Sequence, residues 1–190
     1  MVDVLRIRDI DIQLVRQFLA EQNLSLMAVA DNNDIPGSHW GDDEAGLIGG
    51  TLYARSDTPV HSVLHEACHY FLMDTKRREE LHTDAGGTAV EENAVCYLQI
   101  RLADRFAAIG SQRMCEDMDR WGYSFCLGSA SAWFDRDAED AVLFFKGRKF
   151  LGPFQLVATI RKIDPKTPPS LQRFPFYIRF GIAKDSRSEG

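Results

Sequence analysis

The pattern of hydrophobic and polar positions predicts a small sheet followed by a mainly helical body. Apolar residues recur at helical spacing over residues 10–24, and residues 26–30 are short enough for a strand. Residues 45–54 fit a second strand that contains glycines. Helical patterns then cover residues 59–75, 90–108, 111–121 and 130–145. This order of elements predicts an α+β fold.

The glycines within residues 45–54 allow two interpretations. A glycine inside a strand often marks a bulge or a close approach of a ligand to the backbone, and this strand would then bind an extended peptide along its edge. Alternatively, the glycines shape a turn between two short strands. The sequence leaves both interpretations open.

The helix predicted over residues 59–75 contains His65-Glu66-Ala67-Cys68-His69, an H-E-x-x-H motif. Residues i and i+4 of a helix lie on one face about 6 Å apart along the axis, so both imidazoles can reach one metal ion. Glu66 would lie beside the ion and accept a proton from a zinc-activated water. The alternative is a buried helix whose two histidines are hydrogen-bonded core residues.

The residues around the motif support its place inside a helix. Ser56 to Pro59 supplies an N-cap with proline at the first helical position. The apolar residues of the segment form a broad stripe, which predicts a helix packed on one side. His61 is expected at the surface or in a supporting role, because residues i and i+8 are about 12 Å apart and cannot share an ion. Cys68 is expected to be a core thiol.

A catalytic zinc takes three protein ligands, and the next predicted helix begins with Glu91 and Glu92, 22 and 23 residues after His69. This spacing resembles that of the gluzincins. The sequence H-E-x-x-H followed by E-x-x-A is similar to that of the ImmA/IrrE-type metallopeptidases and the CAAX prenyl peptidases, over residues 59–105. The resemblance implies a zincin-like fold and a zinc metallopeptidase acting on a peptide or protein. Its zinc ligands would be His65, His69 and Glu91, with Glu66 as the catalytic base.

Glu91 and Glu92 compete for the third ligand position. Thr88 to Glu91 is also a capping box, in which the Glu91 carboxylate would fold back onto the backbone and leave Glu92 to bind the metal. Helical spacing favours Glu91, because it lies on an apolar stripe whereas Glu92 shares its face with Gln99. We therefore expect Glu91 as the ligand and Glu92 as the alternate.

The chain departs from those families at Val95, where they place a polar residue. Valine cannot accept a hydrogen bond from a ligand imidazole, so Asp84 is the candidate for that supporting role. A hydrolase also needs a donor that stabilises the developing oxyanion. The candidates, between which the sequence does not choose, are His82, Tyr53 and Tyr97.

Length and composition limit the number of domains and the kind of protein that this chain can be. The 190 residues, 45% of them hydrophobic, predict one zincin-like domain over residues 1–152 and a basic, proline-rich, partly disordered tail over residues 153–190. No signal-like segment or long apolar stretch occurs, and the four cysteines are widely spaced. These features predict a cytoplasmic protein with free thiols and no membrane partner.

Charge is unevenly distributed along the chain. Residues 146–190 hold ten Lys or Arg against three Asp or Glu, although the whole chain carries a net charge of −6. The main body is therefore strongly acidic and is not expected to bind nucleic acid.

Two functions are compatible with these features. The first is a zinc-dependent hydrolase, and the second is a zincin-like fold that serves as a non-catalytic binding or regulatory module. Glu66 favours the hydrolase, because a structural zinc site closes its fourth position with a protein ligand and has no use for a base.

Overall fold

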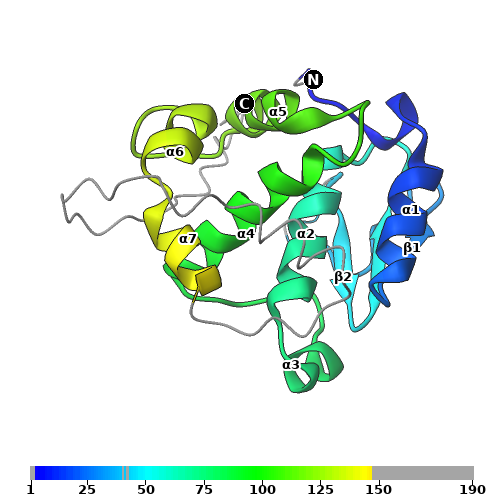
Figure 1. The fold of residues 1–190 in the computed structure, drawn as a ribbon. Helices are drawn as coiled ribbons and strands as arrows, with labels where there is room; N and C mark the ends of the chain where they lie inside the picture. The colour runs from blue at the N-terminus through cyan, green and yellow to red at the C-terminus, as the bar shows by residue number, and fades with distance from the viewer. Residues whose placement is uncertain (1–2, 40, 42, 147–190) are drawn as a thin grey trace, which may run out of the picture.

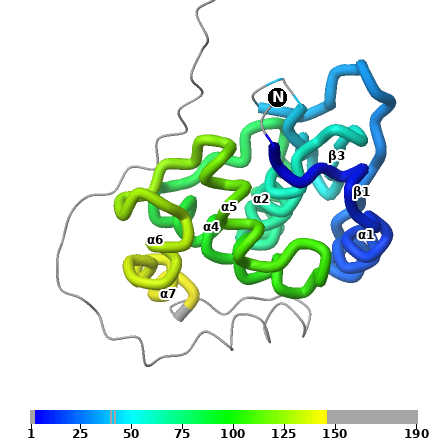
Figure 2. Tube along the Cα trace, turned by 90° about the horizontal axis from the view of Figure 1, so that it is seen from above, coloured from blue at the N-terminus to red at the C-terminus, as the bar shows by residue number. Residues whose placement is uncertain are grey.

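A computed structural model describes residues 3–39, 41 and 43–146. It has the predicted α+β architecture, with a small three-stranded sheet and a mainly helical body (Figure 1). A short 3₁₀ helix η1 (Ile7–Asp9) and helix α1 (Ile12–Glu21) precede the sheet, and helix α2 (Val60–Leu72) follows it. Helix α4 (Ala89–Ala103) packs against α2 on the side away from the sheet (Figures 1 and 2). The motif helix therefore lies in the middle of the molecule.

The sheet has the order β1-β3-β2, with strands β1 (Ser25–Ala28), β2 (Gly46–Ile48) and β3 (Thr51–Ala54). β1 pairs with β3 in parallel, and β2 pairs with β3 in antiparallel fashion. The register places Leu26, Leu52 and Leu47 in one row across the three strands. All three leucines are buried, and α2 packs on β3 and β2. This leucine row joins the sheet to the motif helix.

Residues 45–54 form a hairpin, so the turn interpretation of the glycines is the correct one. Gly49 has a φ of 53°, a left-handed conformation that favours glycine. The outer edge of β2 is bonded to the chain itself, because Gly49 donates to Leu81 O at 2.9 Å and Thr83 donates to Leu47 O at 3.1 Å. These contacts occupy the edge at which a peptide was expected to bind.

The second half of the described chain is helical. Helix α5 (Gly110–Trp121) packs on α4, followed by α6 (Ala130–Arg136) and α7 (Glu139–Lys146), where one helix over residues 130–145 was predicted. Gly110 is the first residue of α5. Among the described residues, no helix is both long and apolar enough to span a bilayer. The four cysteines are free thiols, as predicted, and the basic tail over residues 153–190 lies outside the described residues.

Helix α2 is shorter and more buried than predicted. It begins at Val60, with Pro59 at the N-cap and no side-chain cap, and a separate helix α3 (Thr75–Glu80) follows it. Packing on one side only is wrong, because the sheet, α4 and α5 all contact α2. Of its thirteen residues, all of them described, only Glu66 is not buried. Glu66 is therefore where the motif helix reaches solvent.

Candidate metal centre

Helices α2 and α4 bring together three side chains that can bind a metal, His65, His69 and Glu92, whose ligand atoms lie within 4.8 Å of one another. The two Nε2 atoms of the histidines are 3.1 Å apart. The Glu92 oxygens lie 3.4 Å from His69 Nε2 and 3.8 Å from His65 Nε2. Ligands about 2.0–2.2 Å from a tetrahedral zinc are roughly 3.3 Å apart. The cluster therefore fits a zinc ion in both donor type and spacing.

Glu91, the expected third ligand, makes a different contact. Its Oε1 accepts a hydrogen bond from Arg77 Nη1 at 2.7 Å. Half of the predicted capping box is present, because Thr88 Oγ1 accepts from the Glu91 N–H at 3.3 Å, but the Glu91 carboxylate binds Arg77 instead of the backbone. The structure therefore favours the alternate, because it places Glu92 and not Glu91 beside the two histidines.

The reason lies in the packing of α4. This helix contacts α2, α5 and α7, so residues on nearly all of its sides are buried. An apolar stripe then does not identify the face that meets the motif helix. The face that Glu92 shares with Gln99 meets α2, as the contacts of both side chains show.

Gln99 provides the support for a ligand imidazole that was expected from Asp84. Its amide nitrogen donates to His61 O at 2.9 Å, which leaves Oε1 to accept from His65 Nδ1 at 3.1 Å. The Nδ1 atom therefore carries the proton, and the lone pair of Nε2 points to the cluster. Asp84 is exposed and accepts from Gly86 N at 2.8 Å. The seven-residue spacing from Glu92 to Gln99 is the sequence signal for this role.

The charges of the cluster suit metal binding. Burial and the neighbouring His69 lower the pKa of His65 to about 4, so its imidazole is neutral at pH 7. Burial also acts to lower the pKa of His69, but the hydrogen bond and charge of Glu92 outweigh it and raise the pKa. The pKa of Glu92 is lowered because the contact with His69 outweighs the effect of burial. A metal ion would displace the proton that these two residues share.

Glu66 has the properties of a general base. Burial raises the pKa of its carboxyl to about 7, opposed by His69 and reinforced by the carboxylates of Glu44, Glu92 and Asp84. A base whose pKa lies near the working pH both accepts and releases a proton readily. Glu66 therefore combines access to solvent with a suitable pKa.

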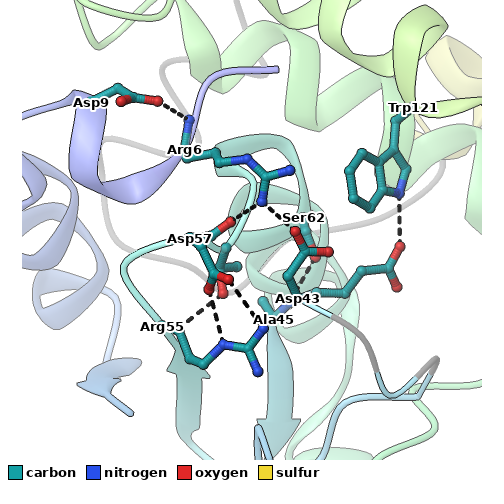
Figure 3. Close-up of polar contacts among 10 residues, drawn as sticks. Arg6, Asp9, Asp43, Ala45, Arg55, Asp57, Ser62 and Trp121 are labelled. Carbon is teal, nitrogen blue, oxygen red and sulfur yellow. Dashed lines mark hydrogen bonds and ion pairs between the residues drawn. The ribbon is translucent and has the colours of Figure 1, made fainter. Parts of the chain in front are cut away.

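The loop before β2 holds Glu44, one of the carboxylates that raise the pKa of Glu66. Trp121 Nε1 donates to Glu44 Oε1 at 2.8 Å. Two further contacts, drawn in Figure 3, hold the neighbouring residues: Ala45 N to Ser62 Oγ at 2.9 Å, and buried Arg6 to Asp43. The loop is thus attached to α2, α5 and the N-terminal segment.

The expected oxyanion donors do not contact the cluster. The ring of Tyr97 stacks on Phe134 at a centroid distance of 4.8 Å. Within the described residues, neither Tyr53 nor His82 has a hydrogen bond to the metal-binding side chains, and His82 bridges to Ile48 at the edge of the sheet. These two candidates lack any contact that would favour them.

Tyr123, which the sequence analysis missed, lies beside the cluster. Its ring packs edge-on against His65, with centroids 5.8 Å apart. Burial, followed by the charges of Cys96, Glu44, Glu66 and Glu92, raises the pKa of its phenol above the usual range. Its phenol therefore stays protonated, and its ring lies next to the site. Tyr123 follows Gly122, the C-cap of α5, and no local motif marks it.

His61 is a core residue, not a surface one. It is 1% exposed, and its ring lies against Trp121 and Tyr123 at centroid distances of 5.0 and 5.6 Å. Neither ring nitrogen has a hydrogen-bond partner among the described residues. Burial lowers the pKa of His61 to about 3. Cys68, fully buried, is the predicted core thiol.

We predict that His61→Phe makes the zinc-free protein less sensitive to acid. The pKa of His61 is about 3 when folded and about 6.5 when unfolded, so between these values the unfolded chain binds the extra proton. Its contribution to the free energy of unfolding therefore falls by about 2 kcal/mol between pH 7 and pH 5. Phenylalanine keeps the ring packing and removes this loss. The free energy of unfolding in urea, measured at both pH values, tests this prediction. His82→Phe, at an exposed position, is the control. An equal pH dependence in wild type and His61→Phe would contradict the prediction.

Comparisons with protein-family models, curated proteins and solved structures find no match to this chain. The similarity to the gluzincins therefore stays a prediction from the motif. The geometry of the cluster provides an independent basis for a functional proposal.

Proposed function

We propose that this protein is a zinc-dependent metallopeptidase or related hydrolase of gluzincin type. His65, His69 and Glu92 would bind the zinc, and Glu66 would be the catalytic base. The observation that carries the proposal is the convergence of three donor atoms at zinc-ligand spacing beside a partly exposed glutamate whose pKa is about 7. A structural zinc site needs a fourth protein ligand, and within the described residues the cluster offers three.

Each residue of the site has a defined task in this proposal. Bound zinc supplies Lewis acidity, which acidifies water and polarises a substrate carbonyl. Glu66 accepts a proton from the attacking water and passes it to the leaving amine. Tyr123 donates a hydrogen bond to the carbonyl oxygen as negative charge develops there. Gln99 holds His65 in the tautomer that presents Nε2 to the metal.

Metal analysis of the purified protein tests the first part of the proposal. We expect about one zinc per chain, because three ligands of the right type converge. His69→Ala should remove the zinc, whereas His82→Ala, which removes an exposed imidazole outside the cluster, should retain it. Wild type and His69→Ala that remain equally metal-free after zinc is added would contradict the metal centre. Zinc binding without hydrolysis of any peptide would favour the non-catalytic binding module.

A further inference from the structure

Arg77 of helix α3 binds Glu91, the first of two adjacent glutamates at the start of α4. Its Nη1 donates to Glu91 Oε1 at 2.7 Å, and its Nη2 donates to Ala85 O at 3.0 Å. The Glu91 side chain is 8% exposed and the Arg77 side chain 36% exposed. Because a buried carboxylate is costly without a partner, this ion pair determines where the Glu91 carboxylate lies.

The same short helix is also attached to the motif helix. Arg78 Nε donates to Tyr70 O at 2.8 Å, and its guanidinium lies 4.4 Å from the centroid of the Tyr70 ring. Its Nη2 donates to Phe71 O at 3.3 Å. Two consecutive arginines therefore connect the C-terminal end of α2, which carries the histidines, to the N-terminal end of α4, which carries the glutamates.

The two carboxyl groups both lie beside Gly87. A side chain built at Gly87 would have its Cβ 3.3 Å from Glu92 Oε1 and 3.6 Å from Glu91 Cδ. The charge of Glu91 also acts on His69. If Arg77 did not hold it, the Glu91 carboxylate would be near enough to compete with Glu92 for a cation at His65 and His69.

We infer that Arg77 is a positioning residue that selects Glu92 as the third metal ligand by holding Glu91 away from the metal. The inference rests on the proposed metal centre and concerns which of two neighbouring carboxylates completes it. It also assigns a purpose to α3, because the helix sets how the glutamates of α4 face the histidines of α2.

The first measurement is zinc affinity, by competition with a chelating dye, for wild type, Arg77→Ala and the control Lys76→Ala. Lys76 is the preceding cation on α3, and its side chain is 82% exposed. We expect Arg77→Ala to weaken zinc binding about 10-fold, since residues that orient metal ligands contribute about 10- to 100-fold. Lys76→Ala should bind zinc as wild type does. Circular dichroism of the zinc-free variants checks that they are folded, and Glu91→Gln, which breaks the ion pair but supplies no competing carboxylate, should bind zinc within about 10-fold of wild type.

The second measurement decides whether Arg77 selects the ligand or only stabilises the fold. Glu92→Gln should weaken zinc binding at least 100-fold when Arg77 is present and about 10-fold when Arg77 is alanine, because the released Glu91 then replaces Glu92. Adding Glu91→Gln to the double variant should remove the remaining affinity. The absorption spectrum of bound Co²⁺ should show retained coordination in the double variant and its loss in the triple variant.

If Glu92→Gln lowers the zinc affinity equally in the wild type and in Arg77→Ala, the inference is overturned, because Glu91 then does not replace Glu92. A wild type that binds no zinc would overturn both the metal centre and the inference. A wild type that binds zinc but cleaves no peptide would count against the proposed hydrolysis alone, since the zinc affinities still decide the role of Arg77.

Discussion

Glu66→Gln is expected to abolish peptide hydrolysis and leave the zinc in place. Glutamine has nearly the same shape as glutamate but cannot accept the proton of the attacking water. General base catalysis contributes about 10²- to 10⁴-fold, so kcat should fall by at least 100-fold. The metal should remain, because Glu66 is not among the three clustered ligands. Turnover of a peptide library and zinc content, measured on the same preparations, check both parts.

Glu21→Gln is a matched control, because Glu21 is an exposed glutamate at the end of α1. Its zinc content and turnover should equal those of wild type. Loss of zinc in Glu66→Gln would make Glu66 a ligand or a structural group. Undiminished turnover would remove Glu66 as the base and would require another acceptor near the site.

Glu92→Gln is expected to lose zinc, whereas Glu91→Gln keeps it. Glu92 is the carboxylate within 3.4 Å of His69 Nε2, while Glu91 binds Arg77 at 2.7 Å. Removal of a ligand should weaken zinc binding at least 100-fold, and loss of the Arg77 contact by less than about 10-fold. Zinc dissociation constants of both variants, measured at one pH, check this because protons compete with the metal for its ligands.

The two variants also test whether Glu92, which the structure favours, or Glu91, which helical spacing favours, is the third ligand. Tight zinc binding in Glu92→Gln with its loss in Glu91→Gln would restore the assignment that helical spacing favours. Tight binding in both variants would count against a glutamate as third ligand and therefore against the gluzincin type of site. The two substitutions differ by one position on the same helix, so each is the control for the other.

The local features of the site could be predicted from the sequence. The four-residue spacing of His65 and His69 alone requires both imidazoles to share a face of a helix, and Glu66 follows directly. Asp11, an aspartate just before the first apolar helical pattern, is the N-cap of α1, and its side chain accepts a hydrogen bond from Gln13 N. The α+β class followed from the order of the predicted strands and helices along the chain. These predictions succeed because backbone geometry over a few residues does not depend on the rest of the chain.

The side of each helix that meets the site depended on tertiary structure. Helix α4 packs against α2, α5 and α7, so its apolar pattern does not mark one inward face, and for that reason it did not identify Glu92 as the carboxylate beside the histidines. Arg77, 14 residues before Glu91, then holds the neighbouring carboxylate elsewhere. Tyr123 reaches His65 only because α5 ends beside the motif helix. The sequence by itself determined the histidine pair and the glutamate that follows the first of them, whereas helix packing and a distant ion pair decided which carboxylate lies beside the histidines, because both join residues that no local spacing relates.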